Sequence, residues 1–173
     1  MLEVPIIRWG RIDNARKFVM PLHATKYAAA HDLYLPVDIR LRPGEITRVG
    51  LNLCCAMPSN FYCNVHIRSG VGFKYGVILS NGTGIVDSDY YNEWFLSLYM
   101  LPQEHIDDPD ERLYDFYEET CYKFSAGERI AQAVFSVKPD YETSDMFFEA
   151  EEIQKIVTQR GSDRHGGLGH TGK

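Results

Sequence analysis

The stretch Phe61–Ile67, FYCNVHI, alternates between apolar and polar side chains along its length. In an extended chain, Phe61, Cys63 and Val65 fall on one face, and Asn64 falls on the opposite face. A period of two is typical of a strand with one buried face, so this segment predicts a strand within a sheet.

Short segments of similar character occur on both sides of this strand. They are rich in Val, Ile, Tyr and Phe, and turn residues separate them at intervals of roughly ten residues. We expect further strands at residues 5–9, 17–20, 32–35, 45–54, 75–80, 84–86, 94–100, 121–124 and 129–137. Many short strands joined by turns predict an all-β fold, either closed or made of two sheets. Helices are expected only at residues 108–119, with Asp108 as the N-cap, and at residues 144–156.

Length and charge limit the function classes. The 173 residues suit one domain, and the formal net charge of -6 argues against a general nucleic-acid-binding protein. The acidity is concentrated in residues 104–119, EHIDDPDERLYDFYEE, which hold eight acids and one arginine. This acidic insertion is interpreted either as a solvated surface segment or as a docking site for a protein partner.

The sequence also carries expectations about compartment. No apolar run approaches the roughly 18–20 residues that span a bilayer, and the first residues lack the layout of a signal peptide. We therefore expect a cytoplasmic protein with no membrane partner. The four cysteines show no zinc-binding spacing and are expected to be small buried side chains.

The stretch Asn81–Trp94, NGTGIVDSDYYNEW, places Asp87 and Asp89 between an apolar run and two tyrosines, directly after a glycine-rich turn. Asp is rare in strands and common in turns, so one interpretation is a hairpin with a charged exit. The other is a carboxylate held at the mouth of a pocket, where it activates water.

Three further positions combine polar groups with strands. Arg68, Ser69 and Gly70 follow a strand and offer a guanidinium, a hydroxyl and accessible N–H groups, which suit a phosphate as well as an ordinary loop. Gln132 shares a strand face with apolar neighbours and needs a backbone or ligand partner. Asp32, inside an apolar strand, needs a salt bridge or a nearby cation.

The C-terminus changes character. Residues 160–173, RGSDRHGGLGHTGK, hold five glycines together with arginine, histidine and lysine. Such a segment is expected to be mobile until a ligand binds it, and its composition suits an arm that closes over a polyphosphate. We therefore expect a β domain at residues 1–153 and a mobile C-terminal arm at residues 154–173.

Taken in order, these motifs resemble those of the trimeric dUTPase family. RSGVG, NGTGIVDSDYYNE and GERIAQ are similar to its second, third and fourth motifs nearly letter for letter. The resemblance implies a jelly-roll-like β-barrel and a homotrimer whose active sites are shared between subunits. It also implies that the C-terminal arm of one chain closes a site built by others.

The resemblance implies a reaction and residue roles. The family hydrolyses dUTP to dUMP and diphosphate, which keeps uracil out of DNA and supplies dUMP for dTMP synthesis. Asp87 would activate a water that attacks the α-phosphorus, Asn81 would read uracil, and Tyr90 would pack against deoxyribose. Asp32 would support a water on Mg²⁺ that the triphosphate carries. The expected phosphate and arm contacts are Arg68, Ser69, Gly70, Gln132, Arg160, Leu168, Gly169, His170 and Thr171.

The chain departs from the family pattern at several points. Leu168 stands where an aromatic residue usually covers uracil, so Leu168, His165 or His170 is expected to take that role. Ala30 and His31 precede Asp32 where the family usually carries glycine, and Asn92 replaces a glycine.

Two other functions remain as alternatives. One is a regulatory or binding protein on the same scaffold, of the phage type. The other is a dCTP deaminase, which would need a glutamate at the position of Ser97.

Overall fold

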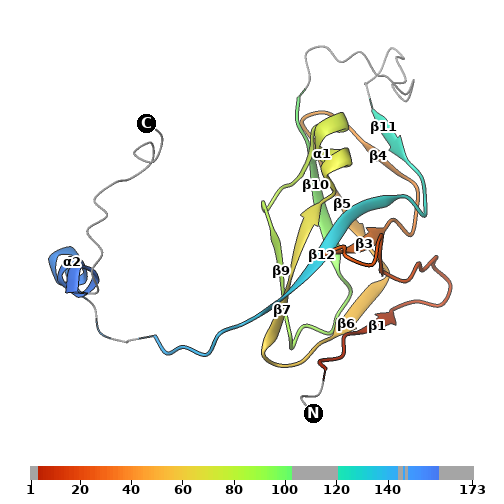
Figure 1. The fold of residues 1–173 in the computed structure, drawn as a ribbon. Helices are drawn as coiled ribbons and strands as arrows, with labels where there is room; N and C mark the ends of the chain where they lie inside the picture. The colour runs from red at the N-terminus through yellow and green to blue at the C-terminus, as the bar shows by residue number, and fades with distance from the viewer. Residues whose placement is uncertain (1–3, 103–120, 144–145, 147, 160–173) are drawn as a thin grey trace. The chain divides into compact units, whose positions relative to one another are not determined.

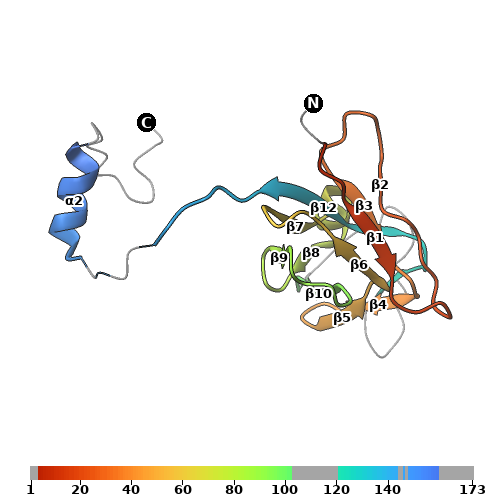
Figure 2. The same ribbon diagram turned by 90° about the horizontal axis from the view of Figure 1, so that it is seen from below.

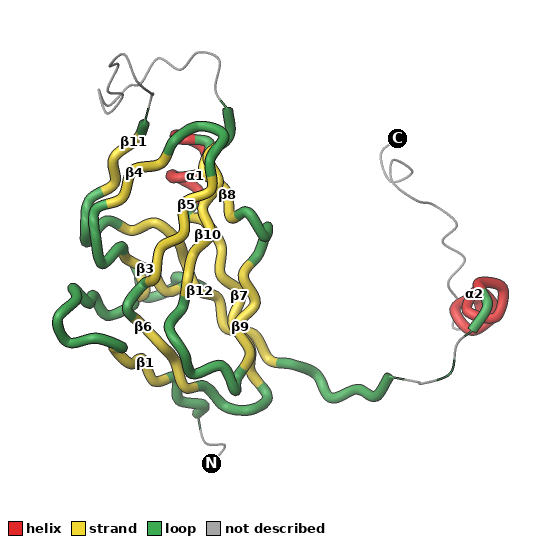
Figure 3. The backbone as a smooth tube through the Cα atoms, turned by 180° about the vertical axis from the view of Figure 1, so that it is seen from behind, coloured by secondary structure: helices red, strands yellow, loops and turns green. Residues whose placement is uncertain are grey.

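The computed structural model describes residues 4–102, 121–143, 146 and 148–159. The chain divides into two compact units, Met1–Pro139 and Asp140–Lys173. In the described residues the first unit contains twelve strands and one short helix, and the second contains one helix. Figures 1 and 3 show how the chain is divided between strands, helices and loops.

The largest sheet has β7 near its centre. Its strand order is β2-β3-β12-β7-β9, and each neighbouring pair is antiparallel. Its members are β2 (Leu22–His23), β3 (His31–Tyr34), β12 (Arg129–Val137), β7 (Phe61–Ile67) and β9 (Gly84–Asp87). The alternation that predicted β7 is confirmed at its centre, where Cys63 and Val65 are buried.

Three smaller sheets complete the first unit. Strands β12 and β7 lie on one side of it, and β5 and β10 lie on the other (Figure 2). One sheet contains β5 (Ile46–Gly50), β10 (Phe95–Met100) and β8 (Val77–Leu79). The two pairs are β1 (Arg8–Arg11) with β6 (Leu53–Ala56), and β4 (Ile39–Leu41) with β11 (Tyr122–Phe124). The buried core draws on both sides and includes Leu33, Leu35, Leu98, Met100 and Ile130.

The all-β prediction is confirmed, with local differences. The strand predicted at residues 45–54 is broken into β5 and β6, because Asn52 has a left-handed φ of 56°. Residues 17–20 form no strand, and β1 lies three residues later than expected at its start. Strands β2 and β4 were not predicted.

The expected loop after β7 is a helix, α1 (Ser69–Tyr75). It buries Val71 and Tyr75, and it ends at Gly76, whose left-handed φ of 62° lets its N–H donate to the Gly72 carbonyl. Glycine adopts this conformation without steric cost, so the helix stops there and β8 begins.

In the second unit, α2 (Ala150–Gln159) begins later and ends later than the helix predicted at residues 144–156. The helix predicted at residues 108–119 lies outside the described residues. The division into a domain at 1–153 and an arm from 154 stays a prediction. Neither described helix has the length and apolar character needed to cross a membrane.

Candidate active site

A pocket of about 250 Å³ lies beside β9 and collects three of the predicted site residues. Asn81, Asp87 and Tyr90 all line it, and we call it the Asp87 pocket. Its other walls are mainly apolar, with side chains from Leu51, Val65, Leu79, Ile85, Trp94 and Phe95. A few polar groups on an apolar wall are typical of a site for a small organic ligand.

The turn between β8 and β9 brings Asn81 to this pocket. Gly82 has a left-handed φ of 73°, and its N–H donates to the Leu79 carbonyl at 2.9 Å. At Gly84, an added Cβ would come 3.2 Å from the Val65 Cβ, so β9 approaches β7 closely there. The two glycines therefore fix the path of the chain into the pocket.

Asp87 ends β9, opposite Tyr62 of β7, and its side chain is exposed. The Tyr90 N–H donates to the Asp87 carbonyl at 3.1 Å, and the Tyr90 hydroxyl donates to the Glu93 carbonyl at 2.9 Å. These bonds hold the tyrosine ring beside Asp87. Within the described part of the chain, Asp89 is exposed and stands outside the lining of the pocket.

A second pocket, of about 420 Å³, collects Arg68, Ser69 and Gln132, and we call it the Arg68 pocket. Leu79 of β8 lines both pockets. Gly70 is exposed in the first turn of α1, next to the pocket-lining Ser69, while the Val71 N–H of the same turn donates to the Arg68 carbonyl at 3.0 Å. The Ser69 hydroxyl, the Gln132 amide and the Arg68 guanidinium suit an anionic ligand.

A bulge in β12 positions Gln132. The pairing of β12 with β3 shifts between Arg129 and Ala131, and both Ile130 and Ala131 are fully buried. The simple alternation had placed Gln132 on the face of Ile130. Because the bulge interrupts that alternation, the Gln132 amide instead lines the Arg68 pocket and is only half-buried.

Asp32 lies opposite Gln132 in the sheet and is only 6% exposed. Its Oδ1 lies 3.0 Å from the Arg68 Nε, and its Oδ2 accepts from the Arg129 Nη1 at 3.1 Å. The salt-bridge interpretation of Asp32 is therefore confirmed. The buried carboxylate holds the Arg68 head group at the pocket, as a paired buried charge requires.

The same contacts bear on Mg²⁺. Across the residues that the structure describes, no group of three or more His, Cys, Asp or Glu side chains could hold a metal ion. Both oxygens of Asp32 already face an arginine, although a carboxylate oxygen can accept a second hydrogen bond. A Mg²⁺ carried by the phosphate oxygens of a nucleotide and by water would fit these residues, because Asp32 could still accept a hydrogen bond from such a water.

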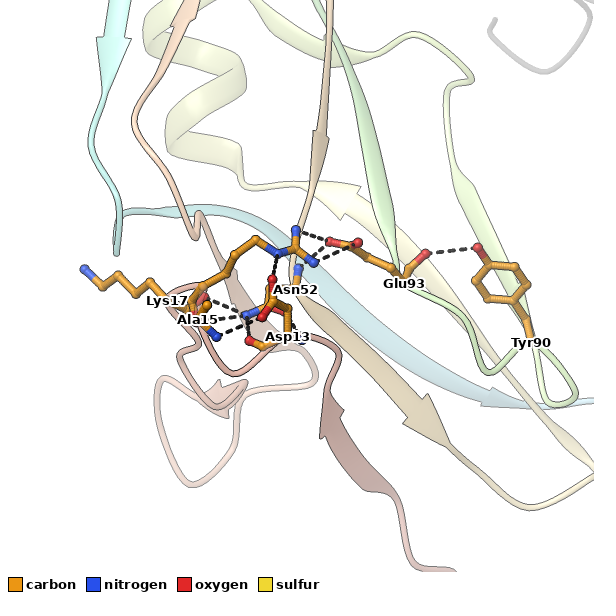
Figure 4. Close-up of polar contacts among 7 residues, drawn as sticks. Asp13, Ala15, Lys17, Asn52, Tyr90 and Glu93 are labelled. Carbon is orange, nitrogen blue, oxygen red and sulfur yellow. Dashed lines mark hydrogen bonds and ion pairs between the residues drawn. The ribbon is translucent and has the colours of Figure 1, made fainter.

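A network that the sequence did not predict joins the N-terminal segment to the Asp87 pocket (Figure 4). Arg16 donates to both oxygens of the Glu93 carboxylate, at 2.8 and 3.0 Å, and the Asn52 N–H donates to the same carboxylate at 2.8 Å. Sequence reasoning missed these residues and Arg129. Glu93 and Arg129 lie inside recognised motifs, but their partners are 77 and 97 residues away in the chain.

Several predicted site residues lie outside the described residues. These are Arg160, Leu168, Gly169, His170 and Thr171, together with the acidic insertion at residues 104–119. Ser97, at the position of the deaminase glutamate, lies with its hydroxyl 2.7 Å from that of Ser80. A hydroxyl that is hydrogen-bonded to another serine stands where the deaminase would need a carboxylate.

Comparisons with known proteins identify the family of the chain. The dUTPase family model matches residues 16–107. A deoxyuridine 5'-triphosphate nucleotidohydrolase from Thermoanaerobacter sp. is 32% identical over 171 residues, which cover 96% of this chain and 97% of that protein. The chain belongs to the dUTPase family. A Haemophilus influenzae protein of the same name is 33% identical over 95% of this chain and 93% of its own length.

Solved dUTPase structures share the fold. A dUTPase of Staphylococcus bacteriophage 80alpha has a TM-score of 0.67 at 20% identity and covers 97% of this chain and 99% of that one. The enzyme from Streptococcus mutans has a TM-score of 0.63 at 22% identity over 78% of this chain and 98% of that one. These likenesses support the jelly-roll-like dUTPase fold. A phage phi11 dUTPase of S. aureus, with a TM-score of 0.64 at 16% identity over 82% of this chain and 98% of that one, is described with a structural Mg(II) ion.

Proposed function

We infer that this dUTPase-family protein hydrolyses dUTP to dUMP and diphosphate. One observation carries the inference for this chain. Asn81, Asp87 and Tyr90, which come from a turn, a strand end and a second turn, line one largely apolar pocket. A nucleobase and sugar need such a pocket, and phosphoryl transfer needs a nearby group that accepts a proton from water.

In this proposal, the Asp87 carboxylate accepts a proton from a water molecule. The water oxygen forms a bond to the α-phosphorus, the bond from that phosphorus to the bridging oxygen breaks, and diphosphate leaves. Such general-base assistance typically contributes about 10²–10⁴-fold to the rate. The exposed position of Asp87 at the end of β9 leaves room for both water and nucleotide.

Nucleoside selection is assigned to Asn81 and Tyr90. The Asn81 side-chain amide offers both a donor and an acceptor, as a uracil edge requires. The Tyr90 ring, 40% exposed at the pocket, would pack against the deoxyribose and leave no room for a 2′-hydroxyl.

Phosphate binding is assigned to the Arg68 pocket. Arg68 supplies charge, and Ser69, Gly70 and Gln132 supply neutral donors, so the pocket suits a polyanion. Asp32 acts here as the positioning partner of Arg68. Arg160, Leu168, Gly169, His170 and Thr171 remain the proposed contacts of the C-terminal arm. When bound to the nucleotide, Mg²⁺ would neutralise part of the phosphate charge.

We also propose a homotrimer with shared active sites. The nucleoside and phosphate residues of one chain line two separate pockets, as expected if each active site combines residues from different subunits. Large apolar side chains beside the Asp87 pocket are exposed in the single chain, with Ile85 66% and Phe95 65% exposed. Burial against another subunit would remove this apolar area from water.

Diphosphate release from dUTP, dTTP, dCTP and UTP, each with Mg²⁺, tests this function. We expect turnover of dUTP far above that of the other three. Binding of dUTP without diphosphate release would favour a regulatory protein on the same scaffold, and ammonia release from dCTP would favour a deaminase. Light scattering during size-exclusion chromatography tests the trimer.

A further inference from the structure

We propose that Arg16, Asn52 and Glu93 form a brace that positions Tyr90 and so sets the preference for deoxyribose over ribose. We call these three residues the Glu93 brace. The inference rests on the proposed function, because it assigns a selectivity role within the same pocket. None of the three was predicted from the sequence as a site residue.

The first part of the argument is the Glu93 carboxylate itself. Its side chain is only 15% exposed, and the carboxylate accepts three hydrogen bonds: two from N–H groups of Arg16, one to each oxygen, and one from the main-chain N–H of Asn52. The two-pronged contact with a planar guanidinium fixes the orientation of the carboxylate as well as its distance. The arginine and the N–H both favour the charged form, so they lower the pKa of Glu93.

Asn52 fixes the other end of this arrangement. It is fully buried with a left-handed backbone, and its side-chain amide donates to the carbonyls of Asp13, Arg16 and Lys17 at 3.0–3.1 Å. Its Oδ1 accepts from the Asp13 N–H at 2.8 Å. One side chain thus ties the segment that carries Arg16 to the junction of β5 and β6.

The backbone makes room for the Glu93 carboxylate. A Cβ added to Gly50 would collide with the Glu93 Oε1 and lie 2.9 Å from its Cδ. Gly50 has an ordinary backbone conformation, so its missing side chain matters for space rather than for φ. This provides a second way to disturb the brace without changing any charged residue.

The brace reaches the pocket through the main chain of Glu93. The Glu93 carbonyl accepts the Tyr90 hydroxyl at 2.9 Å, so the tyrosine ring is anchored to the residue that Arg16 holds. The main chain of the next residue, Trp94, is also fixed: its N–H donates to the Leu53 carbonyl, and its carbonyl accepts from the Leu51 N–H. Through the hydroxyl bond, a shift of the Glu93 main chain would move the Tyr90 ring, which lines the Asp87 pocket.

Loss of the Glu93 brace should lower the preference for dUTP over UTP more than it lowers the rate of dUTP hydrolysis. Asp87 is held by its own pairing with β7, and among the described residues it makes no hydrogen bond to Arg16, Asn52 or Glu93. Exclusion of a 2′-hydroxyl depends on how closely the ring approaches the sugar. A looser ring admits the hydroxyl while leaving the attacking water in place.

The test measures kcat and KM for dUTP and UTP in Arg16→Met, Glu93→Gln, Gly50→Ala and the double variant Arg16→Met/Glu93→Gln. We expect each single variant to lower the ratio of kcat/KM values, dUTP over UTP, by about tenfold, comparable to the discrimination that one small group provides in a fitted pocket. The double variant should lower the dUTP/UTP ratio no further than the more damaging of the two single variants does, because both changes remove the same Arg16–Glu93 interaction. Arg16→Lys should restore part of the ratio.

A matched control removes an ion pair elsewhere. The Lys123 Nζ and the Asp38 Oδ2 are 3.6 Å apart, both side chains are about half exposed, and neither residue lines the Asp87 pocket or the Arg68 pocket. Lys123→Met should leave the dUTP/UTP ratio unchanged. Melting temperatures measured on all variants separate loss of stability from loss of selectivity.

Two outcomes would overturn the brace. If Arg16→Met and Gly50→Ala lower the melting temperature but keep the parent ratio, the contacts are only structural. If the control lowers the ratio equally, the effect is not specific. Failure of the function itself looks different: the parent would neither turn over dUTP nor prefer dUMP over UMP in calorimetric binding, which would overturn both proposals.

Discussion

The two pockets are built in different ways. The Asp87 pocket has a mainly apolar lining, and its polar residues are fixed by glycine turns, main-chain bonds and the Glu93 brace. The Arg68 pocket depends on charge, with one buried carboxylate, Asp32, facing Arg68 and Arg129. The first arrangement controls shape, and the second controls where positive charge is placed.

This difference predicts how each pocket responds to mutation. Changes in the Asp87 pocket should alter the chemical step or the choice of nucleoside. Changes in the Arg68 pocket should weaken every triphosphate alike, since phosphate contacts carry no information about the base or sugar. The following predictions are ordered from the largest expected effect to the smallest.

Asp87→Asn should lower kcat for dUTP by at least about 10²-fold, because the amide cannot accept the proton of the attacking water. Binding of a non-hydrolysable dUTP analogue should persist, measured by calorimetry. Asp89→Asn, in the same turn, is the matched control and should lose far less. Near-normal turnover by Asp87→Asn would remove the base from the proposed mechanism.

Arg68→Met should lower kcat/KM for dUTP by about 10–100-fold, the usual range for losing a hydrogen bond to a charged group. Steady-state kinetics with dUTP and UTP should show a similar loss for both. Arg129→Met removes the other partner of Asp32 from a position outside the pocket lining, so its loss should be smaller. A larger loss for Arg129→Met would reverse the assignment of the phosphate contact.

Tyr90→Phe should reduce the dUTP/UTP selectivity by about two- to tenfold, since it removes one hydrogen bond and keeps the ring. The effect should not add to that of Arg16→Met, because both changes act on the anchoring of the same ring. Full additivity of the two effects in kcat/KM ratios would show that the hydroxyl and the brace act independently.

The Glu93 brace should also give a pH-dependent contribution to stability. The folded protein lowers the pKa of Glu93, with the Arg16 hydrogen bonds as the largest cause. The contribution is therefore complete above the ordinary glutamate value of 4.5 and is lost as pH falls through the lowered folded value. Urea unfolding of the parent and Glu93→Gln should differ near neutral pH and converge in acid; a difference that grows in acid would contradict this.

Much of the fold and part of the site could be predicted from the sequence. The alternation in β7 and the turn residues between strands are local signals, and local signals were sufficient for the all-β class. The residues Asn81, Asp87 and Tyr90 could be grouped because they lie in one continuous motif. Their convergence on a single pocket agrees with that grouping.

The errors arose where distant residues decide local structure. Asn52 breaks a predicted strand, and its left-handed backbone is stabilised by carbonyls 35–39 residues away. Nothing adjacent to Asn52 in the sequence indicates those partners. The pairing of Arg16 with Glu93 and the bulge before Gln132 likewise depend on tertiary contacts and strand register.

The central claim is that Asp87 directs water to the α-phosphorus of dUTP. The most direct measurement is hydrolysis in water enriched in a heavy oxygen isotope, after which dUMP and diphosphate are separated and the mass of each is measured by mass spectrometry. Attack at the α-phosphorus predicts that the heavy oxygen appears in dUMP. Heavy oxygen in the diphosphate would mean attack at the β-phosphorus and would contradict the account.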